Sequence, residues 1–288
     1  MVQKNCEFQD LAPHHGKRWP IWFPVAILLL AETVYALDGA GSPQPLSAPR
    51  GQWILLGDYS DEFNEPSIDS SKWDTNPASW GDWLWDPANA VVSGGTLHLR
   101  MRYEPRQEGG KQFSYTSGIV HSRAPPLRYG YFEARVRASL LHPGISPAFW
   151  VYRNDADRWT EIDFFELTEQ QDVHDVDLSV HAFRDERLKA GEVIHDTAHW
   201  KASWDPRTAF HVYGCEWDER EIRWYVDGEL ARTRVNDHWH QPLDVTFSLG
   251  LRPPLDKHPS PAGFPAEFQV DYVRVWKSPT AAPNVNRQ

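Results

Sequence analysis

Residues 161–166, Glu-Ile-Asp-Phe-Phe-Glu, contain three carboxylates at a spacing that suits acid–base chemistry. Side chains alternate between the faces of a regular β-strand, so Glu161 and Asp163 would share one face and Glu166 would point the other way. A β-bulge, one inserted residue at position 164 or 165, would return Glu166 to the face of the other two. The Cα atoms of the two glutamates would then be ~13 Å apart. Their carboxyl groups could approach to roughly 5–6 Å, close to the spacing at which one carboxylate attacks a glycosidic carbon and the other donates a proton.

The structural alternative is an ordinary solvent-facing strand, because acidic and apolar residues often alternate on the wet face of an antiparallel sheet. The neighbouring sequence favours chemistry instead. Trp159 precedes the acidic segment, and residues 147–150, Pro-Ala-Phe-Trp, predict another aromatic strand just before it. Like charges held close together cost stability, so a fold that keeps them beside aromatic surface is expected to use them. Aromatic faces next to carboxylates suit a sugar ring, which has an apolar C–H face and a polar rim.

The composition restricts the class of protein. The chain has 288 residues, 41% of them hydrophobic, and 15 tryptophans, which exceeds the needs of one core and indicates an aromatic-lined groove. A net charge of −11 argues against a nucleic-acid partner, and against an anionic substrate unless positive charge gathers locally. The sequence lacks a Gly-rich phosphate loop, a Cys-X-X-Cys pair and a His-Glu-X-X-His helix. The 13 histidines give no coherent set of zinc ligands.

The ends of the chain differ from its centre. Residues 1–36, with an apolar run after Lys17 and Arg18, are predicted to be an export signal, although a single membrane anchor is the alternative. Residues 37–52 are predicted to form an exposed linker, 53–277 the catalytic domain and 278–288 a disordered tail. Loss of the signal would remove Cys6 and leave Cys215, on an alternating strand, as a buried apolar residue without a disulfide partner.

From residue 53 onward the chain predicts strand after strand. Apolar side chains recur at every second position in 97–103, 132–136 and 243–249, and Asp227-Gly228 is a strong hairpin signal. No window sustains the apolar spacing of an amphipathic helix for three turns. We therefore expect an all-β fold, a two-sheet antiparallel β-sandwich of jelly-roll type.

Several of these segments together resemble glycoside hydrolase family 16. The resemblance covers residues 53–277, and it implies an open substrate cleft on the concave sheet of the jelly roll. It implies that Glu161 is the nucleophile, Glu166 the acid/base and Asp163 the carboxylate that orients the nucleophile. The segments that match the family are 60–64, 117–120, 129–135, 161–166 and 210–213.

Three stretches, residues 77–86, 160–170 and 239–252, are most similar to the κ-carrageenase and furcellaran hydrolase type within that family. The resemblance implies that Arg252 meets a galactose-4-sulfate, and a guanidinium fork suits a sulfate oxyanion. A salt bridge at a strand end is the structural alternative for Arg252.

Other candidates for the cleft are Trp80, Trp150 and Trp159, which could stack on sugars or belong to the core. His181, on a strand expected beside the acidic one, could bond to substrate or be an ordinary sheet histidine. No cofactor is expected for catalysis. The resemblance implies a structural calcium ion far from the cleft, with Asp271 as a candidate ligand, although six or more oxygens would be needed.

Together these features predict a monomeric, secreted or periplasmic, retaining endo-hydrolase that cuts β-1,4 bonds in sulfated red-algal galactans such as κ-carrageenan or furcellaran. We expect no nucleic-acid partner, and no membrane association after signal removal. The alternatives are a β-agarase, porphyranase or β-1,3-glucanase of the same family. An agarase that cuts a neutral galactan, or a β-1,3-glucanase, would need no arginine at position 252. A non-catalytic carbohydrate-binding jelly roll is a further alternative, but a lectin has no use for three clustered carboxylates.

Overall fold

The computed structural model describes residues 43–47, 53–168 and 172–278. The predicted signal (1–36), most of the predicted linker (37–52) and all but the first residue of the predicted tail (278–288) lie outside these ranges. In the described part of the chain, helix is confined to two short 3-10 turns, η1 (Gly57–Tyr59) and η2 (Pro87–Asn89). None of its helices is long and apolar enough to cross a bilayer.

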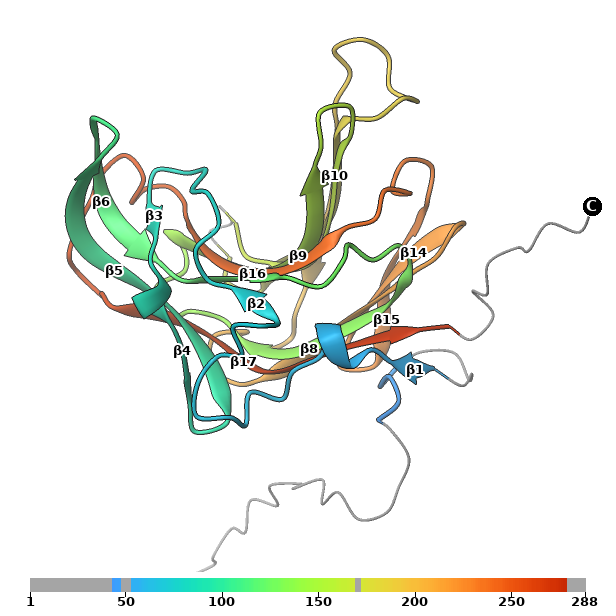
Figure 1. The fold of residues 1–288 in the computed structure, drawn as a ribbon, viewed down its shortest axis with the longest axis horizontal. Helices are drawn as coiled ribbons and strands as arrows, with labels where there is room; N and C mark the ends of the chain where they lie inside the picture. The colour runs from blue at the N-terminus through green and yellow to red at the C-terminus, as the bar shows by residue number, and fades with distance from the viewer. Residues whose placement is uncertain (1–42, 48–52, 169–171, 279–288) are drawn as a thin grey trace, which may run out of the picture. The chain divides into compact units, whose positions relative to one another are not determined.

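The larger of two sheets has ten strands, and the C-terminal strand lies in its interior (Figure 1). Its main path runs β15-β14-β13-β8-β17-β5-β6-β3, with β1 paired to β17 and β4 paired to β5. Neighbours are antiparallel except β3 and β6, which pair in parallel. The strands are β1 (Ile54–Leu55), β3 (Leu84–Trp85), β4 (Ala90–Ser93), β5 (Thr96–Glu108), β6 (Lys111–Ser117), β8 (Gly130–Arg137), β13 (His211–Trp217), β14 (Glu221–Val226), β15 (Glu229–Val235) and β17 (Ala266–Lys277).

The second sheet has seven antiparallel strands in the order β12-β11-β10-β9-β16-β7-β2. Strand β10 contains the acidic segment and lies between β9 and β11. The strands are β2 (Trp73–Asp74), β7 (Ile119–Ser122), β9 (Ile145–Asn154), β10 (Trp159–Glu166), β11 (Asp175–Arg184), β12 (Ile194–Lys201) and β16 (Asp244–Leu251).

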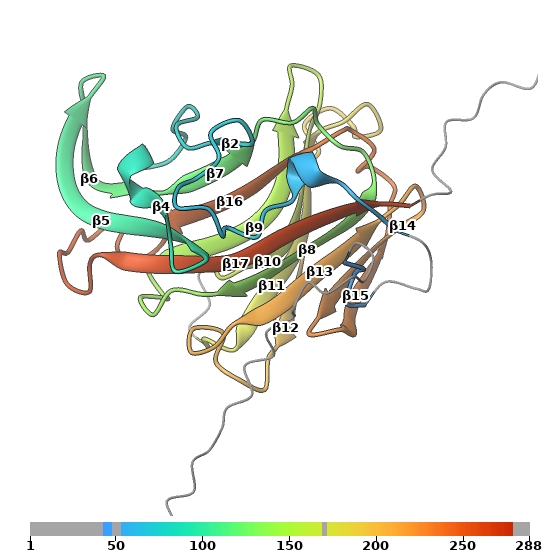
Figure 2. The same cartoon turned by 60° about the horizontal axis from the view of Figure 1, so that its bottom comes forward.

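The core lies between the two sheets, which Figure 2 shows as layers. Alternation along the strands fills it: Phe149 and Phe247 stack with ring centroids 4.5 Å apart, and Phe149 meets Phe164 edge-on. All three side chains are fully buried. Cys215 is also fully buried, as its strand pattern predicts. The expectation of an all-β, two-sheet jelly roll is confirmed, with the parallel β3–β6 pair as its one departure from antiparallel pairing in the described chain.

The described part of the predicted linker, residues 43–47, is bonded to the ten-stranded sheet. The Trp276 indole donates to the Pro43 carbonyl at 2.7 Å, and the Leu46 amide donates to the buried Glu133 carboxylate at 2.8 Å. Gln44 and Leu46 are exposed, and Leu46 is 55% exposed although its amide is bonded to the sheet. The buried acceptor on β8 is a contact that prolines and small residues in the sequence do not reveal.

Candidate active site

Strand β10 contains the bulge that the acidic spacing predicts. Asp163 pairs with Trp150 of β9, and the next pair joins Phe165 to Phe149, so Phe164 is the inserted residue. Pairing with β11 shifts over the same interval. Phe164 and Phe165 are both fully buried, whereas the acidic side chains lie on the outer face of the seven-stranded sheet. The bulge is confirmed, and it brings the three carboxylates to one side.

A bulge interrupts the ladder and leaves backbone groups that need other partners. The Asp163 carbonyl receives one from the opposite sheet, because the Trp224 indole of β14 donates to it at 2.8 Å. Trp224 is fully buried and Asp163 is 3% exposed. This contact ties the bulge to the core.

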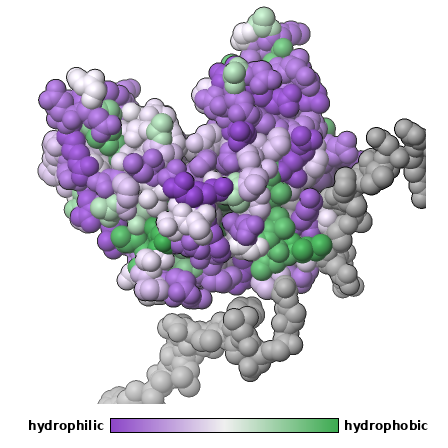
Figure 3. Space-filling model, viewed as in Figure 1, coloured by the Kyte–Doolittle hydropathy of each residue, from purple (hydrophilic) through white to green (hydrophobic). Residues whose placement is uncertain are grey.

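The outer face of the seven-stranded sheet forms a groove of about 1410 Å³. Figure 3 shows a hollow between the lobe formed by β5 and β6 and the lobe above β10, with mostly hydrophilic residues on both lobes. The groove crosses the strands, since residues of β7, β9, β10, β11, β12 and β16 all line it. A chain molecule laid across the sheet would therefore pass over the carboxylates of β10.

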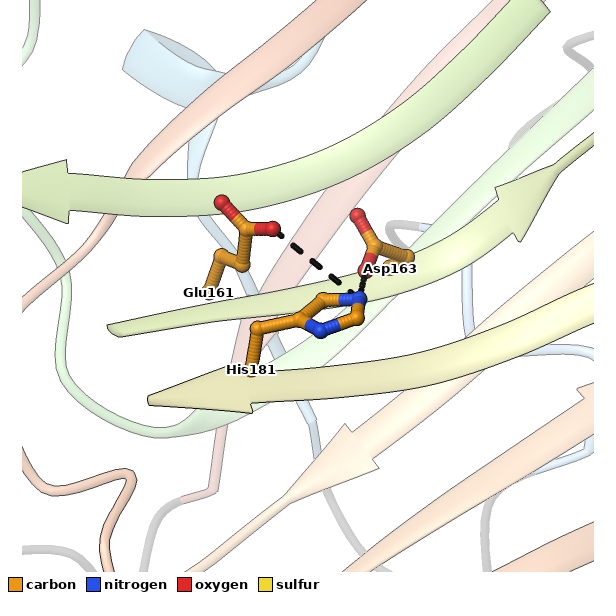
Figure 4. A group of neighbouring side chains, drawn as sticks. All are labelled: Glu161, Asp163 and His181. Atoms are coloured by element: carbon orange, nitrogen blue, oxygen red, sulfur yellow. Dashed lines mark ion pairs between the residues drawn. The ribbon is translucent and has the colours of Figure 1, made fainter. Parts of the chain in front are cut away.

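His181 of β11 lies against the first two carboxylates. Its Nε2 atom is 3.3 Å from Asp163 Oδ2 and 4.0 Å from Glu161 Oε1, as Figure 4 shows. The sheet register explains this position, because His181 is the cross-strand partner of Glu161. The prediction that His181 lies on the strand beside the acidic one is confirmed.

Glu166 is bonded to two other groups. Its Oε1 atom accepts from the Ser146 hydroxyl at 2.9 Å and from Arg252 Nη2 at 2.8 Å. The Arg252 side chain is 30% exposed and lines the groove next to the carboxylates. Arg252 thus forms the salt bridge at a strand end that was its structural alternative. The bridge lies inside the groove, and its partner is Glu166, the predicted acid/base.

Burial raises the pKa of both glutamates, and the negative charge of Asp163 raises it further. His181 opposes the rise at Glu161, and Arg252 opposes it at Glu166. The pKa shifts in the same direction at both positions, because burial on the floor of the same groove removes both carboxyl groups from water.

The three candidate tryptophans all line the groove. Trp80 is 46% exposed, Trp150 stacks on Tyr152 with centroids 4.2 Å apart, and Trp159 stacks on Phe183 at the same distance. Trp80 meets Trp150 and Tyr152 edge-on. The groove therefore has one aromatic cluster on the β9 side of the carboxylates and another at the β10–β11 end.

Sequence reasoning missed several groove residues. Ser146 could have been found, because counting back by twos from Trp150 along β9 places it on the groove face. Tyr152 follows from the same count in the other direction. Asp177 follows from the same count along β11, starting from His181. It is 2% exposed and pairs with Glu166 across β10 and β11, and its carboxylate lies 2.6 Å from His199 of β12.

Asp271, the candidate calcium ligand, lies on β17 in the ten-stranded sheet. Its Oδ2 atom accepts from Arg135 Nη1 at 2.7 Å. A guanidinium at this oxygen does not fit a calcium ligand, and the calcium ion stays a prediction. Among the described residues, three metal-ligating side chains gather within 4.8 Å only at Glu161, Asp163 and His181, where they contact one another.

A two-sheet jelly roll with three carboxylates on the floor of an aromatic-lined groove defines a class, the glycoside hydrolases that act on polysaccharides. Comparison with known proteins gives the family. The model for the family 16 domain of β-porphyranases A–D matches residues 53–278. The chain belongs to glycoside hydrolase family 16.

Among its relatives is the κ-carrageenase of Pseudoalteromonas carrageenovora, 34% identical over 88% of this chain and 72% of that protein. The β-glucanase of Rhodothermus marinus is 30% identical over 82% of this chain and 89% of that protein. The crystal structure of the Pseudoalteromonas enzyme with a κ-carrageenan oligotetrasaccharide superimposes with a TM-score of 0.72, covering 82% of this chain and 99% of that one. The resemblance to family 16 and to its κ-carrageenases is confirmed.

Proposed function

We propose that this protein is an endo-acting, retaining hydrolase of β-1,4 bonds in sulfated galactans, with κ-carrageenan or furcellaran as substrate. The observation that favours this substrate class is the position of Arg252. Its guanidinium lies in the groove, 2.8 Å from Glu166, so a sulfate that it binds would be on a sugar next to the reacting bond. The 34% identity to a κ-carrageenase supports the same choice.

The proposed reaction has two displacements. Glu161 attacks the anomeric carbon while Glu166 protonates the departing glycosidic oxygen, which gives a covalent glycosyl–enzyme. Glu166, now a carboxylate, removes a proton from water, and the resulting hydroxide displaces Glu161 with net retention. Asp163 orients Glu161, and the His181 cation beside both stabilises the ionised nucleophile.

Glu166 must hold a proton in the first step, yet Arg252 favours its ionised form. A substrate sulfate resolves this conflict, because it competes with the Glu166 carboxylate for the Arg252 guanidinium. As Arg252 turns toward the sulfate, burial and Asp163 act on Glu166 with less opposition, and the carboxyl group takes up a proton. A neutral galactan offers no such exchange.

The groove geometry fits attack within a polymer. It crosses six strands of the sheet and has aromatic side chains on both sides of the carboxylates, which suits sugars bound on either side of the cut. The chain is proposed to be exported and to act as a monomer that needs no cofactor for catalysis.

The test supplies purified protein with κ-carrageenan, furcellaran, porphyran, agarose and laminarin, and follows product size and the anomeric configuration of the first products by NMR. We expect oligosaccharides from κ-carrageenan or furcellaran, released early as the β-anomer, and none from laminarin. The Glu166→Gln variant is the control for contaminating activity. Cutting of agarose or porphyran without the κ-type polymers would refute the substrate, and α-anomers would refute retention.

The second candidate is a β-porphyranase, favoured by the family model that matches residues 53–278. The same panel separates the two, because porphyran cleavage would then exceed κ-carrageenan cleavage.

A further inference from the structure

A row of side chains crosses the edge of the seven-stranded sheet next to the carboxylates. Strand β12 is the edge strand, and its register places His195 opposite His181, which in turn is opposite Glu161. The Nδ1 atoms of the two histidines are 2.8 Å apart, which is hydrogen-bond distance. Both rings also contact Phe183 of β11. The row therefore links an exposed edge strand to the nucleophile.

The charges around His181 decide which nitrogen donates. Burial lowers its pKa, but the bond to Asp163 and the charges of Asp163, Glu161 and Glu166 outweigh burial and raise the pKa of His181 to about 9. At neutral pH the ring is an imidazolium, and both of its nitrogens are donors. Nε2 faces Asp163, so Nδ1–H must donate to His195. His195 Nδ1 is then the acceptor, and its ring is neutral.

We propose that His195 is a positioning residue for catalysis: it accepts the Nδ1–H of His181 and so fixes the imidazolium with Nε2 toward Asp163 and Glu161. Two observations agree with an acceptor that is neutral. Partial burial and the positive charge of His181 lower the pKa of His195. The side chain of Asp196, the next residue, is bonded instead to Arg232 and Arg234 of β15, so it does not draw a proton onto His195.

The arrangement depends on pH in a defined direction. Protonation of His195 would place two N–H donors against each other at 2.8 Å, and the contact would be lost. Without it His181 can rotate, and the cation that favours ionised Glu161 moves away. The charges that act on His181 are those of Glu161, Asp163 and Glu166 of β10, and Asp177 of β11, His199 of β12 and Arg252 after β16 line the same groove.

The direct test needs no substrate. Imidazole ¹⁵N chemical shifts give the pKa of His181 by NMR in the whole protein and in its variants. His195→Leu removes the acceptor at similar volume, and we expect the protonation equilibrium of His181 to weaken by roughly tenfold, a fall of about one pKa unit. His195→Asn keeps an acceptor near the Nδ1 position and should retain the pKa of His181. His199→Leu removes another groove histidine of the same strand face and should also leave it unchanged.

A pKa of His181 that is equal in all variants would overturn the proposal, as would an equal fall in His195→Leu and His195→Asn. Because His195 lies exposed on an edge strand, the variants should fold, and thermal melting checks this. A His195 that only binds sugar would leave the pKa of His181 unaltered in both variants.

The kinetic arm rests on the proposed function. In His195→Leu we expect kcat/KM to fall roughly threefold to tenfold on the acid side of the optimum, with little loss at the optimum, because Glu161 ionises less readily. His195→Asn should restore the acid limb. If no polysaccharide is cut, the proposed function fails while the NMR titration still decides the role of His195. A uniform loss of kcat/KM at every pH would contradict positioning through charge.

Discussion

Trp224 supports the active site from the opposite sheet, and its replacement tests whether the bulge depends on this support. The indole N–H donates to the Asp163 carbonyl at 2.8 Å in a fully buried environment. Trp224→Phe keeps an aromatic ring but removes the donor. A buried carbonyl left without its partner costs about 1–3 kcal/mol, and the smaller ring adds about 1 kcal/mol for the space it leaves. We expect the free energy of unfolding to fall by about 2–4 kcal/mol.

The effect on activity follows from the position of the carbonyl. Asp163 lies at the bulge, between the proposed nucleophile Glu161 and the proposed acid/base Glu166, and an orphaned carbonyl there favours a shift of the local backbone toward another donor. Such a shift would move Glu166 relative to Glu161. Because misplacement of a catalytic group by about 1 Å can cost on the order of 100-fold, we expect kcat to fall by roughly 10- to 100-fold.

Trp217→Phe is the matched control. Trp217 is also a buried indole, and it donates at 2.8 Å to the Trp239 carbonyl instead of to the bulge. Urea denaturation measures stability, and kcat is measured at saturating substrate well below the unfolding transition. Trp217→Phe should lose less stability, because Asn236 Nδ2 also donates to the Trp239 carbonyl at 3.0 Å, and only Trp224→Phe should lose kcat. Equal losses of kcat in the two variants, or a Trp224→Phe enzyme within threefold of wild type, would refute the reasoning.

Three further predictions concern the groove. Glu161→Gln and Glu166→Gln should each retain at most a few per cent of kcat without loss of stability, as judged by assay and melting temperature, and higher activity would contradict their roles. Arg252→Ala removes the cation that lowers the pKa of Glu166 in the free enzyme, so the alkaline limb of the kcat/KM profile should move to higher pH while KM for the sulfated polymer rises. An unmoved limb would contradict the pairing. Burial raises the pKa of Asp244 to about 6, although Arg153 opposes the rise. The free energy of unfolding should therefore fall as the pH rises from about 4 to 6 and Asp244 ionises. Asp244→Asn should remove about 2–3 kcal/mol of that pH dependence, measured by denaturation at several pH values, and an unchanged slope would count against it.

The parts of the fold that follow from local spacing could be predicted from the sequence. Period-two alternation gave the strands and the sandwich, and the five-residue interval between Glu161 and Glu166 gave the bulge, since no regular strand puts both on one face. The interval did not say which of positions 164 and 165 is inserted. The register with Trp150 and Phe149 of β9 decides that it is Phe164.

Contacts between distant parts of the chain could not be predicted in this way. Trp224 meets Asp163 across 61 positions, and Arg252 meets Glu166 across 86. Alternation says which face of a strand a residue occupies, but not which strand lies opposite it. For the same reason the sequence did not reveal that the Leu46 amide is bonded to the buried carboxylate of Glu133 on the sheet.

The different roles proposed for the two glutamates do not follow from burial. Both carboxyl groups are largely buried, with side chains 16% and 14% exposed, and both lie next to Asp163. The difference must come from the cations. His181 is held in place by neighbouring strands of the sheet and keeps acting on Glu161, whereas Arg252 comes from the end of β16 and can exchange Glu166 for an anionic substrate. Under the proposed function, acid and nucleophile are distinguished when the substrate binds, and a sulfated polymer is expected to distinguish them better than a neutral one.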